Sequence, residues 1–330
     1  MTGVEATVFK GSSTGIIEEA THSFSEPLSG TNVLVKITHS GICGTDEHFL
    51  RTPNMVLGHE GVGTVLVLGP DVPKDQLAVG DVVGWGFTHR VCGRCMECLG
   101  GYDQFGVSNK HQGSYGTHAV WDAAFLFKIP AAIAPEDAAP LMCAGATVFN
   151  VIDSYSVRPT ERVGVVGVGG LGHLAIRFLA KMGCTVVVFS STEAKRDEAM
   201  GLGAHEFIAT KGLTEFKTEP IDRLLVTTSF QPDWPLYIRV MRPRGTIHPL
   251  TVESGNLAIP LNAATKKGLT IQASSVASRA VNIKMLNFVA QHNIKPVIER
   301  FPLTRDGVVE GMDRLRQGKM RYRGVLVNKL

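Results

Sequence analysis

The sequence predicts an α/β protein of two domains, one made mostly of short strands and one built around a parallel sheet. The chain has 330 residues, 44% of them hydrophobic, whereas a single hydrophobic core usually stops growing at about 250–300 residues. Before residue 147, short strand patterns alternate with many glycines and prolines. After it, strand patterns alternate with helical ones, which is typical of a parallel sheet with crossover helices.

In the strand-rich part, alternating or β-branched runs predict the first strands, and the end of the chain combines two amphipathic patterns with a last apolar run. The strands are expected at residues 4–9, 33–37 and 62–67, the two helices at 284–292 and 306–317, and the last strand at 324–327. Both ends of the chain therefore carry elements outside the parallel sheet.

The second part predicts a series of parallel strands separated by helices. Strands are expected at residues 162–166, 185–189, 224–226, 246–248 and 269–271, and helices at 170–182, 194–201 and 235–241. This order is that of a doubly wound sheet.

Charge and cysteine content exclude several classes of function. The 33 basic and 30 acidic side chains are mixed along the chain, so no basic stripe predicts a nucleic-acid partner. No apolar run reaches the roughly 18 residues of a membrane helix, and the start lacks a basic segment followed by an apolar one. We therefore expect a cytoplasmic protein that does not bind membranes. Its six cysteines are too sparse for a disulfide framework, which favours metal-binding or structural thiols.

A glycine motif predicts a dinucleotide site. It directly follows the apolar strand expected at 162–166 and opens the next helix, as G-x-G-x-x-G requires. The glycines allow a tight turn and a close approach of pyrophosphate to the backbone, and the helix N-terminus supplies N–H donors. The alternative is a glycine-rich turn without a ligand. The predicted cofactor-binding residues here are Gly167, Gly169, Gly170, Leu171 and Gly172.

The end of the following strand indicates which nicotinamide cofactor fits. An acidic residue there would bind the free ribose hydroxyl of NAD, but this strand ends in Ser190 and Ser191, followed by Lys195 and Arg196. Hydroxyls and cations suit a 2′-phosphate, so NADP(H) is favoured. In the alternative, the two basic residues only solvate a helix, and nearby Glu193 argues for NAD.

Three residues far apart in sequence, Cys43, His59 and Cys143, stand in glycine-rich or small-residue surroundings. Alone, each is more often a buried apolar thiol or a satisfied histidine. Together, the segments at residues 43–48, 58–63 and 141–147 resemble the zinc-containing medium-chain alcohol dehydrogenases, most closely the cinnamyl alcohol dehydrogenase-like branch. The resemblance covers essentially the whole chain, including residues 202–210 and 320–327.

This resemblance implies a GroES-like, mostly-β catalytic domain from residues 1–145 and 275–330, and a doubly wound parallel Rossmann domain from 146–274. It also implies a homodimer paired through Rossmann edge strands. Cys43, His59 and Cys143 would be zinc ligands, and Glu60 a nearby carboxylate able to coordinate.

The residue types agree with catalysis by this metal. Two thiolates and one imidazole leave a fourth position open, as in catalytic zinc sites, where zinc polarises a carbonyl or lowers the pKa of a bound alcohol. By resemblance, Thr45 would begin a proton relay that ends at His48 nearest solvent, because imidazoles exchange protons near neutral pH. Asp46 would orient the metal-bound imidazole.

One family feature is incomplete. Cys92, Cys95 and Cys98 resemble the start of a structural zinc site, but Gly106 stands where the fourth cysteine is normally found. Three thiolates do not close a Cys₄ site, so a structural zinc is expected to be absent unless His89, Asp103 or His111 completes it. The segments 43–59 and 98–113 are also shorter than usual, and both border the expected substrate cleft.

The leading hypothesis is a zinc-dependent alcohol dehydrogenase or aldehyde reductase that moves hydride between NADP(H) and an alcohol/aldehyde pair, on an apolar or aromatic substrate. The alternative within enzymes is NADPH-dependent reduction of a C=C or C=N bond in a biosynthetic pathway. A non-enzymatic alternative, a cofactor-binding redox sensor or structural protein, predicts loss of metal ligands or relay residues, and this chain retains both.

Overall fold

The computed structural model describes residues 3–25, 27–109, 113–251 and 255–329. Its contacts divide the chain into two compact units. The first combines Met1–Ala146 with Ala277–Leu330, and the second is Thr147–Val276. Within the described ranges, no helix is long and apolar enough to cross a membrane.

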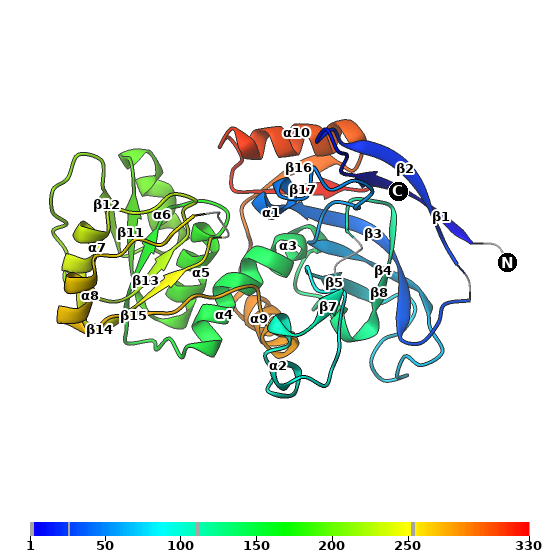
Figure 1. Ribbon diagram of the computed structural model, residues 1–330, viewed down its shortest axis with the longest axis horizontal. Helices are drawn as coiled ribbons and strands as arrows, with labels where there is room; N and C mark the ends of the chain where they lie inside the picture. Colours follow the sequence, from blue (N-terminus) through cyan, green and yellow to red (C-terminus); the bar gives the residue numbers. More distant parts are fainter. Residues whose placement is uncertain (1–2, 26, 110–112, 252–254, 330) are drawn as a thin grey trace. The chain divides into compact units, whose positions relative to one another are not determined.

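The first unit is organised around a mainly antiparallel sheet. Its seven strands, counted over the described residues, run in the order β16-β17-β3-β4-β5-β9, with β8 also paired to β3. They are β3 (Asn32–Ile42), β4 (Gly61–Leu68), β5 (Val82–Trp85), β8 (His118–Asp122), β9 (Phe127–Lys128), β16 (Ile298–Pro302) and β17 (Arg323–Val327). Strand β17 lies antiparallel to β3, so the end of the chain completes a sheet begun near its start (Figure 1).

Two small hairpins and several helices complete this unit. The hairpins are β1 (Val4–Lys10) with β2 (Glu18–Phe24), and β6 (Arg90–Val91) with β7 (Ser108–Asn109). The helices are α1 (Gly44–Glu47), α2 (Met96–Leu99), α3 (Pro135–Pro140), α9 (Arg279–His292) and α10 (Arg305–Arg316), with 3₁₀ turns η1 (Asp103–Phe105) and η2 (Ala123–Phe125) and a π-helical turn, η3 (Leu141–Gly145).

Local sequence signals explain where the two C-terminal helices begin. The Ser278 hydroxyl accepts the backbone N–H of Val281 at the start of α9, and Thr304 does the same for Gly307 in α10. Such capping satisfies N–H groups that have no partner inside the helix. Helix α9 ends at Asn293, whose φ of 49° is the left-handed conformation common after a helix.

The second unit contains a parallel sheet whose described strands run in the order β12-β11-β10-β13-β14-β15. The strands are β10 (Arg162–Val166), β11 (Thr185–Ser190), β12 (Glu206–Ala209), β13 (Ile221–Val226), β14 (Met241–Pro249) and β15 (Thr270–Ile271). The helices are α4 (Ala146–Ser154), α5 (Gly172–Met182), α6 (Arg196–Leu202), α7 (Trp234–Val240) and α8 (Leu261–Lys267), with the 3₁₀ turn η4 (Glu193–Lys195). Figure 1 shows α7 and α8 on one side of this sheet and α5 on the other.

This order is the doubly wound Rossmann topology, so the predicted fold class is confirmed. Several boundaries differ from expectation, and strand β12 was not expected. Helix α9 begins at Arg279 rather than at residue 284, and strand β14 begins at Met241 rather than at residue 246. The helix expected from residue 170 begins at Gly172, because residues 167–171 form the turn itself. The helix expected at 194–201 begins as the turn η4 and becomes α-helical at Arg196.

Candidate functional site

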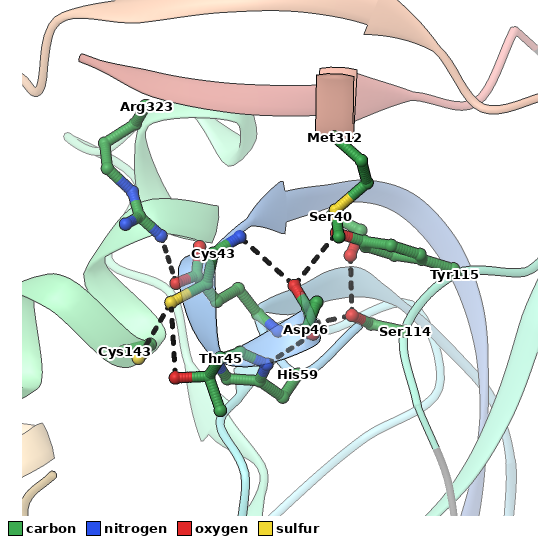
Figure 2. Close-up of polar contacts among 11 residues, drawn as sticks. Ser40, Cys43, Thr45, Asp46, His59, Ser114, Tyr115, Cys143, Met312 and Arg323 are labelled. Carbon is green, nitrogen blue, oxygen red and sulfur yellow. Dashed lines mark hydrogen bonds and ion pairs between the residues drawn. The ribbon is translucent and has the colours of Figure 1, made fainter. Parts of the chain in front are cut away.

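Four predicted residues meet in the first unit: Cys43, His59, Glu60 and Cys143. One donor atom from each lies within 4.8 Å of the others. Antiparallel pairing of β3 with β4 brings the end of one strand beside the start of the other, which places Cys43 near His59 and Glu60. Cys143 lies on η3, and its Sγ is 4.0 Å from that of Cys43 (Figure 2).

Asp46 organises this cluster. Its carboxylate, 2% exposed, accepts a hydrogen bond from His59 Nδ1 at 2.8 Å, from the Tyr115 hydroxyl at 2.9 Å and from the backbone N–H of Cys43 at 3.1 Å. Burial alone would lower the pKa of His59, but the Asp46 carboxylate raises that pKa well above its usual value. Asp46 therefore orients the imidazole of His59 and holds the backbone N–H of Cys43.

The arrangement fits a zinc ion. Because Nδ1 of His59 is held by Asp46, the remaining nitrogen, Nε2, is turned toward the thiols, and it is buried without a hydrogen-bond partner. Such a polar atom is costly unless something binds it. Two thiolates and one imidazole nitrogen are also the donor set of a catalytic zinc site with one position left open.

A buried ion pair lies beside the cluster. Arg323 on β17 donates through a terminal nitrogen to Glu60 Oε1, and both side chains are buried. Burial raises the pKa of Glu60 to about 7, although the guanidinium of Arg323 opposes the shift. A side chain at position 41 would collide with Glu60, which explains the glycine there. Sequence reasoning assigned no role to Arg323, although it lies in the segment 320–327 that carried the family resemblance.

The two predicted relay residues are on and beside the short helix α1. The Thr45 hydroxyl lies 3.7 Å from the Cys43 sulfur. His48 follows at the C-terminal end of α1 with an exposed side chain, and its backbone N–H donates to the Thr45 carbonyl at 3.2 Å. The Thr45 hydroxyl therefore lies beside a predicted metal ligand, and the His48 side chain is exposed to solvent.

The second unit contains a cavity of about 310 Å³ at the carboxyl end of its sheet. Its lining includes Gly167 and Gly169 from the glycine turn. Gly167 has a φ of 93°, and a side chain at Gly172 would collide with the Gly167 carbonyl. A Cβ at Gly169 would meet no atom within 4 Å. The turn therefore requires glycine at Gly167 and Gly172, and Gly169 leaves bare backbone facing open space.

Not all predicted cofactor residues reach this cavity. Ser190, Ser191 and Lys195 line it, and Lys195 Nζ donates to the Val168 carbonyl at 2.6 Å. Gly170, Leu171 and Gly172 form the turn and the helix start and are not among its lining residues. Nor is Arg196: its guanidinium pairs with Glu193, with Nε 2.6 Å from Oε2, and lies 4.9 Å from the centre of the Phe207 ring. This pairing also occupies the acid that would have argued for NAD.

The sequence interpretation missed part of the lining. Thr227, Thr228, Ser229 and Phe230 follow β13 and face the same cavity. The hydroxyls of the first three come directly after a strand that neighbours β10. The carboxyl ends of parallel strands share one edge of the sheet, so this run was a usable signal.

Cys92, Cys95 and Cys98 form a second thiol cluster in the first unit, hereafter the three-thiol cluster. The Cys98 sulfur lies 3.4 Å from that of Cys95 and 3.9 Å from that of Cys92. Cys92 is exposed and Cys98 is buried. Of the three residues considered as a non-standard fourth ligand, His111 lies outside the described residues.

Comparison with known proteins agrees with this geometry. Residues 29–131 match the alcohol dehydrogenase GroES-like domain, and residues 170–291 match the zinc-binding dehydrogenase domain. The chain is 34% identical to an aldehyde reductase of Synechocystis sp., over 91% of this chain and 92% of that protein. The chain belongs to the zinc-containing medium-chain alcohol dehydrogenase family.

Further relatives place this dehydrogenase in the cinnamyl alcohol dehydrogenase-like branch. It is similar to the structure of a cinnamyl alcohol dehydrogenase from Sorghum bicolor, with a TM-score of 0.89, 30% identity and 98% of each chain covered. It is also 30% identical to a protein of Mycobacterium bovis named NADP-dependent alcohol dehydrogenase C, over 93% of this chain and 96% of that protein. The predicted family and enzyme class are confirmed.

Proposed function

We propose that this dehydrogenase transfers hydride between NADP(H) and an alcohol/aldehyde pair, with an apolar or aromatic substrate. The observation that carries the proposal is the buried cluster in which His59 Nε2, without a partner, faces two thiols. A family member used only as a sensor or scaffold has no need to retain this donor set. Relatives named aldehyde reductase and NADP-dependent alcohol dehydrogenase support the same reaction.

Cys43, His59 and Cys143 would hold the zinc ion, with Glu60 as a further carboxylate beside it. When bound, zinc supplies a Lewis acid that polarises an oxygen of the substrate. Asp46 keeps the His59 ring oriented for this task. Arg323 holds the carboxylate of Glu60 by its Oε1 atom and leaves Oε2, which is buried and without a partner, free for the cluster.

Thr45 and His48 would carry the proton that balances hydride transfer. The Thr45 hydroxyl lies beside the Cys43 sulfur, where it can accept or donate a proton close to the metal ligands. The exposed imidazole of His48 can exchange that proton with water. The expected consequence is that His48→Gln slows proton exchange without removing the metal.

Ser190, Ser191 and Lys195 would bind the cofactor at its 2′-phosphate, while the glycine turn receives the pyrophosphate. NADPH supplies the hydride itself, and the protein binds and positions it. Small hydroxyl donors and one cation on the rim of the same cavity suit a phosphate better than a free ribose hydroxyl. Of the two predicted basic residues, Lys195 is the better candidate, because Arg196 is engaged with Glu193.

We also propose the organisation expected from the family. Residues 1–145 and 275–330 would form the catalytic domain and residues 146–274 the cofactor domain. The exposed Ile271 on the edge strand β15 supports pairing of two cofactor domains into a homodimer. A cytoplasmic location is part of the same proposal.

NADPH oxidation against a panel of aromatic and aliphatic aldehydes, with activated alkenes as a second panel, tests the reaction. Reduction of aldehydes by zinc-loaded protein, lost on zinc removal, supports the proposal. Reduction of alkenes alone, with activity retained after zinc removal, would instead indicate the C=C or C=N reductase.

Cofactor choice has a separate test. Replacing Ser190, Ser191 and Lys195 together by alanine should weaken NADPH binding relative to NADH by roughly tenfold or more, because charge-assisted hydrogen bonds to a phosphate are lost. Arg196→Ala is the control, with an unchanged preference expected. A triple variant that keeps the wild-type preference would contradict the assignment.

A further inference from the structure

The three-thiol cluster has the sulfur spacing of a metal site. Its two short Sγ–Sγ distances are 3.4 Å and 3.9 Å, and all three sulfurs lie within 4.8 Å of one another. Sulfurs that share one ion at a typical metal–sulfur distance of about 2.3 Å lie roughly 3.8 Å apart in tetrahedral geometry. The three thiols therefore lie close enough together to share one ion.

The loop backbone also favours a thiolate at Cys92. Gly93 has a φ of 70°, in the left-handed region. The backbone N–H groups of Arg94 and Cys95 lower the pKa of Cys92 to about 7, whereas burial raises the pKa of Cys98 to about 11. N–H groups that point at a sulfur stabilise its negative form, and the thiolate is the form that binds metals.

The described residues offer no fourth protein ligand. Gly106 has no side chain to offer as a ligand. A Cβ built on it would lie 2.6 Å from the Cys98 sulfur, so its backbone lies directly against the cluster. Both Asp103 oxygens are bound by Arg279, one by the backbone N–H at 3.2 Å and one by Nε at 2.5 Å. His89 is buried against Trp121, and its Nε2 pairs with a backbone carbonyl at 3.2 Å.

We propose that Cys92, Cys95 and Cys98 form an open, three-thiolate site for a soft thiophilic ion such as Cu⁺. This differs from a closed Cys₄ structural zinc site, because structural zinc almost always takes four protein ligands. Thiolates select soft ions, and Cu⁺ accepts three of them. On binding, each thiol still protonated releases its proton to solvent, and neither metal nor sulfur changes oxidation state. Exposure of Cys92 gives the ion a path from solvent.

The test is anaerobic titration of the zinc-loaded enzyme with Cu⁺ held by a competing chelator. Wild type should take up one copper per chain without losing its zinc, with a new sulfur-to-metal absorption in the ultraviolet. Cys92→Ser should weaken this uptake at least tenfold. Cys184→Ala, which removes a buried thiol of the second unit, should leave it unchanged. No uptake by wild type, or equal uptake by Cys92→Ser, would overturn the proposal.

Gly106→Cys provides a second and independent measurement. It supplies a fourth thiol next to Cys98 and Cys95, so the ratio of Cu⁺ to Zn²⁺ affinity should fall at least tenfold. An unchanged ratio, or wild type purified with a second zinc that Cu⁺ does not displace, would show that the site is not open. Reductase activity depends on the other cluster, so these results stand whatever reaction the enzyme performs.

Discussion

The two thiol clusters of the first unit use similar donors in opposite surroundings. Around Cys43 and Cys143, the neighbouring polar groups are buried and linked by hydrogen bonds from several distant segments. Around Cys92, the sulfurs belong to one short loop, and one of them is exposed. The two clusters therefore differ mainly in the groups that surround their donor atoms.

The groups around the first cluster come from distant segments that the fold brings together. Asp46 comes from α1, Tyr115 from the segment before β8, and Arg323 from β17 near the end of the chain. Each touches a proposed metal ligand or the carboxylate that orients one. In the part of the chain that the structure describes, the contacts of the three-thiol cluster are mainly between its own sulfurs. The difference predicts that substitutions at the first cluster affect catalysis and stability together, while those at the second affect neither strongly.

The largest effect is expected from removing a ligand of the first cluster. Cys43→Ala or His59→Ala should lower aldehyde reduction by about 1,000-fold or more, because loss of a Lewis acid removes several kcal/mol of transition-state stabilisation. Initial rates of NADPH oxidation measure this. Cys92→Ser is the control and should retain wild-type rates. Near-normal activity in either ligand variant would refute the zinc mechanism.

The next effect concerns stability. Arg323→Met leaves the Glu60 carboxylate buried without its cation, and breaking such a pair costs about 3–5 kcal/mol. Urea unfolding followed by tryptophan fluorescence measures the loss. Arg300→Met is the matched control: Arg300 pairs with Glu136 at the surface, where its side chain is 57% exposed, and such pairs contribute about 0–1 kcal/mol. Equal losses in the two variants would contradict the distinction between buried and exposed surroundings.

Tyr115→Phe should have a smaller and more specific effect. It removes one hydrogen bond to Asp46 while keeping the ring that fills the core. Groups behind metal ligands typically change metal affinity by 10–100-fold, so zinc release to a chelator should accelerate about tenfold. Tyr102→Phe, at an exposed tyrosine, is the control. If Tyr115→Phe lowered the unfolding midpoint but left zinc release unchanged, Tyr115 would have only a structural role.

The smallest effect is expected at the three-thiol cluster in the absence of added copper. Cys92→Ser replaces an exposed thiol, and surface substitutions usually change stability by no more than about 0.5 kcal/mol. Thermal unfolding of the zinc-loaded protein provides the measurement. A loss of several kcal/mol would mean that a structural metal is already bound there and would remove the contrast between the clusters.

Local sequence patterns predicted five of the six strands described in the parallel sheet and missed β12. Strands such as β10 and β11 were predictable because they are short apolar runs bounded by clear turn signals. The family resemblance, rather than a local pattern, predicted which thiols and imidazole would meet at the first cluster. Neither predicted Arg323, Tyr115 or Thr227. The contacts of Arg323 and Tyr115 join segments far apart in sequence, whereas Thr227 follows a strand that neighbours β10. Arg196 shows the converse. Its position in the sequence suggested that it binds the 2′-phosphate of the cofactor. In the structure, Arg196 instead forms an ion pair with Glu193, three residues earlier.

Zinc content measured together with aldehyde reductase activity tests the central claim most directly. Purified wild type should contain one zinc ion per chain, and chelation and re-addition of zinc should abolish and restore activity in parallel. Cys92→Ser should keep that zinc, and Cys43→Ala should lose it. Reductase activity that survives complete zinc removal, or a zinc ion lost from Cys92→Ser but kept by Cys43→Ala, would contradict the account.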